Sequence, residues 1–281
     1  MKSLPTDFHH DEALLIAMDY VLNGQSEKID SISYDLIKQH DRFGDTLLHL
    51  STQSGLFEIT TKLLRRGARI NAVNHYGNTP LHEAVLSGET EIIHLLAAAK
   101  PDLNAQNEDG DTPLHLAARW LDESLIEALL LHQPNVSLRN GEGNTPLHDA
   151  AQTNSPLAVM QLLHQQAPVN AVNFHGDTPL HFAAEQGRTD LVKMLLRKGA
   201  KATIVNHLGR NPLHTAVTNA SLALPSLKAT TLALLDVNLS LEAKDLSGNT
   251  VLMLAKENLE APGFKEFEQY CQRRFRHDSA H

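Results

Sequence analysis

The phrase Gly-Asn-Thr-Pro-Leu-His at residues 77–82 decides the fold, because variants of it recur along the chain. The glycines that open the first six copies are each 33 residues apart, and a seventh follows after 39. Five equal intervals identify a tandem array. The other copies start at Gly44, Gly110, Gly143, Gly176, Gly209 and Gly248, and the last reads Gly-Asn-Thr-Val-Leu-Met.

One copy of the repeat contains the signals for two short helices. Thr79 is a good N-cap, and Pro80 falls at the first helical position, where its missing N–H costs nothing. The first helix should end at about Ser87, and Gly88 separates it from a second helix over 89–98. Helices this short do not persist alone in water, so stability must come from stacking against neighbouring repeats.

A 33-residue period that carries Thr-Pro-Leu-His-x-Ala resembles the ankyrin-repeat family over roughly residues 41–271. The resemblance implies an all-α solenoid of paired antiparallel helices with hairpin tips, forming one curved domain. The expected divisions are an N-terminal helical cap over 1–40, repeats over 41–73, 74–106, 107–139, 140–172 and 173–205, a sixth repeat with an insertion over 206–244, and a degenerate seventh repeat with a C-terminal cap and tail over 245–281.

Two irregular segments lie within this scheme. Residues 12–22 and 27–39 show helical patterns without the repeated phrase, and they are expected to cover the first repeat. Six extra residues around 219–227 must fall between the two helices of the sixth repeat, where they either lengthen the loop or add helical turns.

The net charge of −9 lies in the middle of the chain. Residues 74–106, 107–139 and 140–172 contribute −3, −4 and −2, and the flanks sum to zero. No basic stripe is present, so nucleic acid is not expected as a ligand. A protein partner with a basic surface is favoured instead.

The single cysteine, Cys271, excludes an intrachain disulfide, and no apolar run is long enough to cross a bilayer. The N-terminus lacks the apolar core of a signal peptide. These features predict a cytoplasmic or intracellular protein that does not bind a membrane. We also expect a monomer.

Seventeen histidines raise the question of a metal site. Six of them end the repeated phrase, and the resemblance implies a structural role in which each ring bonds to the backbone of the neighbouring turn. Stacked repeats would hold these rings about 10 Å apart, whereas Zn–N bonds are about 2.1 Å, so we expect no shared metal. The six are His49, His82, His115, His148, His181 and His214.

No catalytic motif or phosphate-binding loop is recognisable, and Cys271 is interpreted as a half-buried capping residue. We therefore expect a protein without enzymatic activity, catalytic residues or cofactors. The competing hypothesis of an enzyme hidden in 1–40 or 255–281 is disfavoured, because these segments are too short for an independent fold.

Ankyrin-like proteins generally bind partners through the hairpin tips and the exposed face of each first helix, on the concave side of the stack. Trp120, the only tryptophan, falls at such a position and is the leading candidate for an interface hot spot. Alternatively, Leu121, which replaces a helix-ending glycine, reorients this helix and buries Trp120. The candidate partner-binding residues are Phe43, Tyr76, Glu108, Asp109, Asp111, Arg119, Trp120, Glu142, Asp149, Phe174, His175 and Leu208.

The leading functional hypothesis is a scaffold or adaptor that binds a protein partner. A narrower version is a bacterial effector that acts inside a host cell, suggested by the acidic stretch that includes Glu257 and Glu268. A third is an inhibitor that blocks a transcription factor or a kinase. Asn71, Asn104 and Asn170 resemble asparagines that are hydroxylated in some ankyrin-like proteins, but side-chain hydrogen bonding in a turn is the favoured role.

Overall fold

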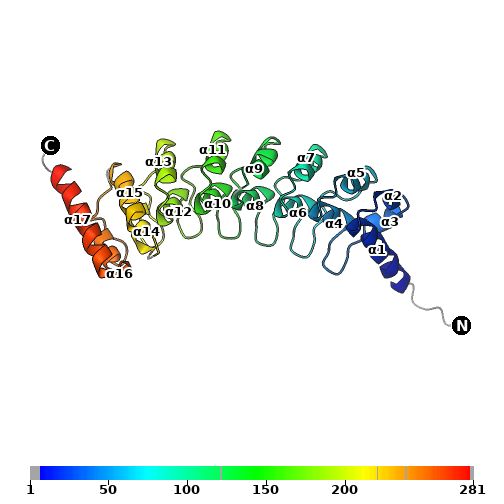
Figure 1. Ribbon diagram of the computed structural model, residues 1–281, viewed down its shortest axis with the longest axis horizontal. Coiled ribbons are helices and arrows are strands. Elements are labelled where there is room, and N and C mark those ends of the chain that lie inside the picture. The colour runs from blue at the N-terminus through cyan, green and yellow to red at the C-terminus, as the bar shows by residue number, and fades with distance from the viewer. Residues whose placement is uncertain (1–6, 121, 220, 238, 279–281) are drawn as a thin grey trace. The chain divides into compact units, whose positions relative to one another are not determined.

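The computed structural model describes residues 7–120, 122–219, 221–237 and 239–278 (Figure 1). Within these ranges the chain is helical, with no strand and with isolated β-bridges that join His40 to Thr46 and Lys244 to Thr250. This confirms the all-α repeat fold. The chain divides into two compact units, Met1–Gly141 (unit 1) and Glu142–His281 (unit 2).

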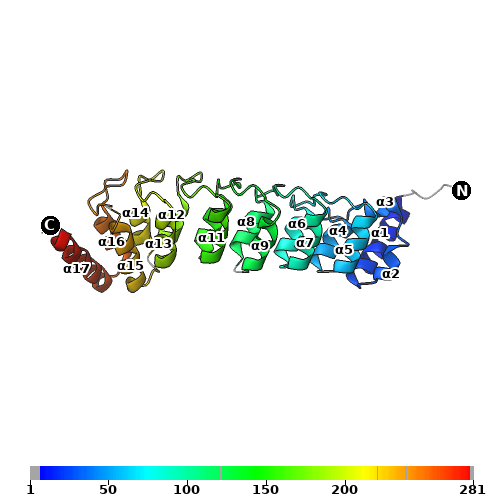
Figure 2. The same ribbon diagram turned by 90° about the horizontal axis from the view of Figure 1, so that it is seen from above.

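Unit 1 contains three helix pairs and an N-terminal group of helices. The first helices of the pairs pack side by side, as do the second helices, so the pairs form two layers (Figure 1). The hairpin loops lie along one edge of these layers (Figure 2). The pairs are α4 (Leu47–Gln53) with α5 (Phe57–Arg65), α6 (Pro80–Leu86) with α7 (Thr90–Ala98), and α8 (Pro113–Arg119) with α9 (Glu123–Leu130); they are preceded by α1 (Asp7–Leu22), α2 (Ser26–Ile29) and α3 (Tyr34–Ile37).

Unit 2 repeats this arrangement. Its first helices form a continuous layer, and α17 packs against both α15 and α16 at the end of the unit. The helices are α10 (Pro146–Thr153), α11 (Pro156–His164), α12 (Pro179–Glu185), α13 (Thr189–Arg197), α14 (Pro212–Thr218), α15 (Leu224–Leu235), α16 (Val251–Asn258) and α17 (Ala261–Asp278).

The repeated phrase starts each first helix by capping it. In α6 the Thr79 side chain accepts a hydrogen bond from the backbone N–H of His82, and Pro80 occupies the first turn. Leu81 and Ala84 on the same helix are fully buried against the stack. Proline at the first position and threonine at the cap explain why these helices begin where the sequence predicts.

The segment 27–39 is not one helix as the sequence pattern suggested, because side chains interrupt it. The Ser31 hydroxyl donates to the backbone carbonyl of Lys28, and the Ser33 hydroxyl accepts from the N–H of Leu36 and caps α3. Serine side chains that bond the backbone in this way compete with a continuous helix. The apolar residues of α2 and α3, including Ile29 and Ile37, still pack into one core with α1 and α4.

The insertion in the sixth repeat is divided between loop and helix. The second helix α15 has 12 residues where α13 has 9, and it begins at Leu224 whereas α14 ends at Thr218. At the C-terminus Phe267 and Cys271 are fully buried, while Phe264 and Tyr270 are partly buried.

After the second helices, three residues hold a left-handed backbone where other repeats have glycine. Lys100, Gln133 and Gln166 follow second helices with φ of 58°, 57° and 63°. Gly67 and Gly199 occupy the same register position with φ of 81° and 90°. Left-handed conformations cost side-chain-bearing residues energy that glycine avoids.

Two glycines of the second repeat give a matched test of how the hairpin tips pack. Both have positive φ, but a Cβ at Gly77 would lie 2.7 Å from the backbone N of Glu108, whereas a Cβ at Gly88 meets nothing within 4 Å. We expect Gly88→Ala to cost about 1–2 kcal/mol in conformational strain. Gly77→Ala should cost at least about 1 kcal/mol more because the tips must separate.

Urea unfolding of the full chain, followed by circular dichroism, measures both variants. Equal unfolding midpoints for Gly77→Ala and Gly88→Ala would mean that contact between the tips is not what requires glycine at position 77.

Candidate functional site

Each hairpin tip is shaped by an asparagine or aspartate three residues before the phrase glycine. The Oδ1 atom of Asn74 accepts from the backbone N–H groups of Tyr76 and Asn78, both at 3.0 Å. Its Nδ2 group donates to Oδ1 of Asp45 in the preceding tip at 2.8 Å. The same amide therefore folds one tip and binds it to the one before.

Backbone hydrogen bonds also join neighbouring tips. The N–H of His75 donates to the carbonyl of Phe43 at 2.8 Å, and the N–H of Glu108 donates to the carbonyl of Tyr76 at 3.0 Å. In unit 2 the N–H of His207 donates to the carbonyl of His175 at 2.9 Å. Because these bonds use only backbone atoms, the side chains at the tips are free to differ.

Outside the tips, asparagines join the loops that follow the second helices. The Oδ1 atom of Asn71 accepts from the N–H of Asp102 at 2.9 Å, and that of Asn104 accepts from the N–H of Asn135 at 2.8 Å. In unit 2 Asn170 accepts from the N–H of Lys201 at 2.7 Å. These bonds link successive repeats rather than residues of a single turn.

The phrase histidines are buried connectors between repeats. In His82 the Nδ1 atom accepts from the backbone N–H of Thr79 at 3.1 Å, so Nε2 carries the proton of the neutral ring. That Nε2–H group donates to the carbonyl of Asp111, 29 residues further on, at 3.0 Å. Equivalent Nε2 bonds join His49 to Asn78, His148 to Asp177, His181 to Arg210 and His214 to Ala243. His115 makes the same Nδ1 contacts with Thr112.

Burial lowers the pKa of four of these rings, His49, His82, His181 and His214, because it disfavours the charged imidazolium. Within the described ranges, no group of three or more histidine, cysteine or acidic side chains could hold a metal ion. The rings instead serve the hydrogen bonds between repeats.

Two of the acidic candidates for partner binding are buried instead. Asp111 and Asp149 are each 1% exposed. The Arg119 guanidinium donates to both carboxylate oxygens of Asp111, at 2.5 and 2.8 Å, and Asn140 donates to the same carboxylate. Asp111 and Arg119 therefore neutralise one another within the protein. The sequence could not reveal this, because the tip aspartate turns inward beneath the next tip.

The remaining candidates in unit 1 are exposed. Trp120 ends α8 with extended backbone and is 44% exposed, so its helix does not bury it; Leu121 lies outside the described residues. At the tips Tyr76 is 61% exposed and Phe43 46%, and the side chains of Glu108 and Asp109 are also exposed. Leu86, at the end of α6, is exposed too, although the sequence did not single it out among the leading candidates.

Unit 2 presents its own exposed tip residues. Phe174, His175 and Leu208 are exposed, as is Glu142. Leu246 is the most exposed of the large apolar residues described, and sequence reasoning missed it. Its position two residues before Gly248, equivalent to that of Phe174 before Gly176, was the signal that could have found it.

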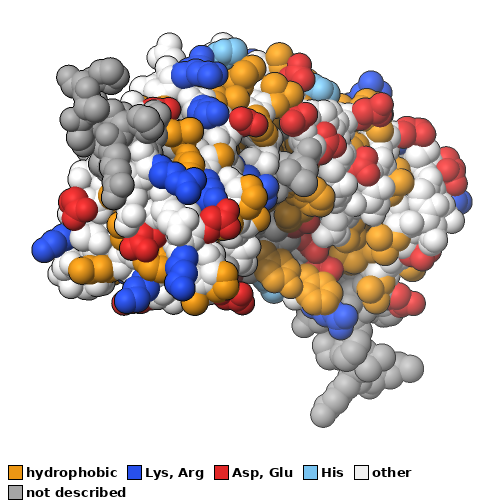
Figure 3. All heavy atoms as spheres, turned by 60° about the vertical axis from the view of Figure 1, so that its left-hand side comes forward, with side chains coloured by type: hydrophobic (Ala, Val, Ile, Leu, Met, Phe, Trp, Pro, Cys, Tyr) orange, Lys and Arg blue, Asp and Glu red, His pale blue; other side chains and the backbone are white. Residues whose placement is uncertain are grey.

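Charge is distributed unevenly between the units. Unit 1 contains 11 Lys and Arg residues against 20 Asp and Glu, whereas unit 2 contains 13 of each. Acidic side chains are numerous on the visible surface of unit 1 (Figure 3). The whole net charge of −9 therefore belongs to unit 1.

Cys271 does not have the properties of a nucleophile. Its side chain is fully buried, and desolvation raises the pKa of the thiol to about 12. A thiol in such surroundings stays protonated and unreactive.

Comparison with known proteins agrees with this geometry. The family model for ankyrin repeats (three copies) matches residues 16–107, 97–173 and 157–229. The chain belongs to the ankyrin-repeat family. Ankyrin repeats are generally protein–protein interaction modules, and the fold is typically non-catalytic.

Among 579 matching chains of solved structures is the ankyrin-repeat domain of Bcl-3, described as a unique member of the IκB protein family. It is 26% identical, with a TM-score of 0.67, and the match covers 80% of this chain and 99% of that one. A search of curated proteins found no match. No described helix is both long and apolar enough to span a membrane.

The buried histidines make the stability of this ankyrin stack depend on pH. Below about pH 6.5 the unfolded chain takes up protons that the folded chain, with its lowered histidine pKa values, does not. The contribution of these histidines to the free energy of unfolding is therefore fully present above about pH 6.5. It decreases as the pH falls, by at most about 1.4 kcal/mol per pH unit for each histidine. Urea unfolding measured between pH 7.5 and 5.5 tests this expectation.

Two variants isolate the histidine effect. His82→Gln should flatten the pH profile more than His75→Gln, which replaces a histidine at an exposed tip position. The comparison is needed because burial raises the pKa of Asp45 and Glu185, whose protonation favours the folded state on acidification. Parallel profiles for wild type and His82→Gln would contradict the assignment.

Proposed function

We propose that the chain is a non-enzymatic adaptor that binds a protein partner through its hairpin tips and the exposed face of its first helices, the concave face of an ankyrin stack. The observation that carries the proposal is the set of exposed apolar side chains Tyr76, Leu86 and Trp120 on unit 1. Large aromatic residues on a surface are the usual anchors of protein interfaces.

The helix packing and the backbone hydrogen bonds beneath these side chains support the proposal. Leu86 and Trp120 stand at the ends of the neighbouring helices α6 and α8, which pack against one another. Tyr76 projects from a tip whose backbone is bonded to the next tip at Glu108. A rigid frame means that little ordering entropy is lost when a partner binds.

The charge of unit 1 favours a partner with a basic surface. The exposed carboxylates of Glu108 and Asp109 lie at the tip that follows Tyr76, and the unit carries the whole net charge of the chain. Acidic rims of this kind increase the rate of association with basic partners and select against acidic ones. In unit 2, Phe174, His175 and Leu208 provide a second set of exposed tip residues.

Affinity capture with the full chain tests the proposed face. We expect Trp120→Ala to weaken binding of the captured partner by about tenfold or more, because hot-spot aromatics contribute at least that much. Val73→Ala is the matched control, since Val73 is a 60% exposed apolar residue of the same unit outside this set. Retention of the partner at unchanged affinity by Trp120→Ala, with native circular dichroism, would remove the site assignment.

The electrostatic part of the proposal concerns the rate of association. We expect the association rate of the captured partner to decrease as salt rises from about 50 to 500 mM, because salt screens exposed charges. The double variant Glu108→Gln/Asp109→Gln should bind more slowly than wild type at low salt and approach it at high salt. Stopped-flow kinetics measure both, and an association rate that does not depend on salt would refute a basic partner.

A further inference from the structure

The N-terminal helix α1 exposes apolar side chains on the face that points away from the stack. Leu14, Met18 and Val21 are buried against the first repeat, but Leu15 is 66% exposed and Leu22 is 60% exposed. These two leucines are seven residues apart, so they lie on one side of the helix about 10 Å from each other. Ile16, beside Leu15, is also exposed.

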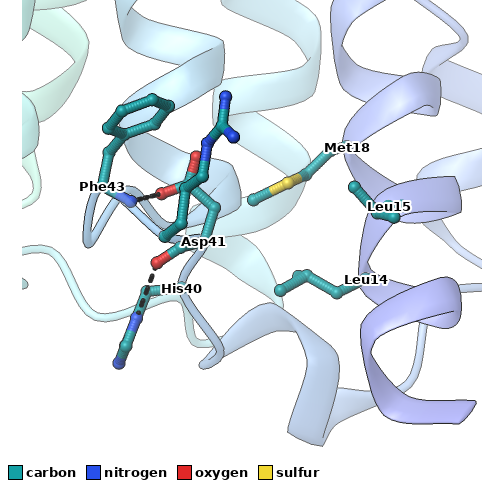
Figure 4. A pocket seen from close by; sticks show the side chains of 7 residues that line it. Leu14, Leu15, Met18, His40, Asp41 and Phe43 are labelled. Carbon is teal, nitrogen blue, oxygen red and sulfur yellow. Dashed lines mark hydrogen bonds between the residues drawn. The ribbon is translucent and has the colours of Figure 1, made fainter. Parts of the chain in front are cut away.

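A pocket of about 720 Å³ adjoins this face, between α1 and the first hairpin tip (Figure 4). Leu14, Leu15 and Met18 line it from α1, and Phe43 lines it from the tip. His40, Asp41 and Arg42 also line the pocket from the tip. The Asp41 carboxylate accepts from the N–H groups of Phe43 at 2.7 Å and Asp45 at 2.9 Å, and the Arg42 guanidinium lies 4.7 Å from the centre of the Phe43 ring. The wall that the tip presents is therefore partly polar, whereas the wall that α1 presents to a ligand is apolar.

Among residues 261–273, the last helix of the chain, α17, buries its large apolar side chains fully or in part and exposes polar ones. In α17 the large apolar side chain of Phe267 is buried, and among residues 261–273 no large apolar residue is exposed. Its outward positions include Lys265, Glu266 and Gln272. Terminal elements of repeat proteins need such a polar outer face for solubility. Helix α1 differs from α17 because its outer face carries exposed apolar side chains.

We propose that the outer face of α1 and the adjoining pocket form a second docking surface, whose occupant is a basic amphipathic helix of a partner protein. The surface adjoins the first hairpin tip at Phe43 but contains none of Tyr76, Leu86 and Trp120, and it goes beyond the function proposed above. An apolar stripe on the partner helix covers Leu15 and Leu22, and one apolar side chain enters the pocket.

Two features select this occupant. Leucines two turns apart match the i, i+7 spacing of anchors on a partner helix, and the array already stacks helix upon helix. The exposed acidic side chains Glu12 and Asp19 lie on the same side of α1 as Leu15 and Leu22. Their charge complements Lys or Arg residues that flank an apolar stripe. Two copies of α1 would instead bring like charges together.

A designed peptide tests the proposal directly. The probe is a fluorescein-labelled helical peptide of 16 residues, the length of α1, made of leucine and lysine with leucine at i, i+3, i+4 and i+7. Fluorescence anisotropy with the full-length chain measures its affinity. We expect Leu15→Ser/Leu22→Ser to weaken binding about tenfold or more, and Glu12→Gln/Asp19→Gln to weaken it by a smaller factor.

Matched controls separate this surface from general attraction to an acidic protein. Leu131→Ser should bind like wild type, because Leu131 has the same 66% exposure as Leu15 but lies at the end of α9. Trp120→Ala should also bind like wild type, so a failure here is distinct from a failure of the function proposed above. A scrambled peptide of the same composition should bind about tenfold more weakly.

Three results would overturn the proposal. One is an affinity of Leu15→Ser/Leu22→Ser equal to that of wild type, with native circular dichroism. Another is a dimer of the wild type that sedimentation detects and that this variant does not form. In that case a second copy of the chain would bind the face. The third is stronger peptide binding after removal of residues 1–6, which would give it to the chain's own N-terminal segment.

Discussion

One buried imidazole in each of the first six repeats holds the architecture together. In the second repeat, His82 accepts from the cap of its own helix at Thr79 and donates to the carbonyl of Asp111 in the next tip. Both bonds require the neutral ring with its proton on Nε2, and the ring has no exposed surface. Helix start, tip position and stacking are therefore set by the same side chain, and losing it would disturb all three.

The hairpin tips can differ in sequence because their outward side chains are not what holds them in place. Backbone atoms and a few buried amides, such as Asn74, position each tip. The position of a tip therefore does not depend on its outward side chains. Phe43, Tyr76 and Asp109 occupy the same register position in successive repeats of unit 1. A surface of this kind can change its chemistry residue by residue while the frame beneath it stays the same.

Much of the fold could be predicted from the sequence, because the signals involved are local. Thr79, Pro80 and Gly88 predict the limits of α6 to within one residue. The inward turn of Asp111 could not be predicted, since it depends on Asn140 and Arg119 meeting one carboxylate in the folded tip. Nor could the division of 27–39 into α2 and α3, because apolar spacing alone does not show that serine side chains bond the backbone.

Only part of the candidate site could be predicted from the sequence, because local signals place some residues and tertiary packing places others. Register placed Tyr76 and Trp120 on the surface, where the structure also has them. The exposure of Leu15 and Leu22 could not be inferred, because α1 lacks the repeated phrase and its apolar residues surround the helix. Only packing against the first repeat decides which of them are covered.

The left-handed residues after the second helices have a consequence for how the stack opens. Lys100, Gln133 and Gln166 hold strained backbone at a position where Gly67 and Gly199 do not. Each such residue stores about 1 kcal/mol that is released when its loop loosens. Amide protons around these three loops should thus exchange with solvent sooner than those beside the glycines, making the interior repeats the places where transient fraying begins.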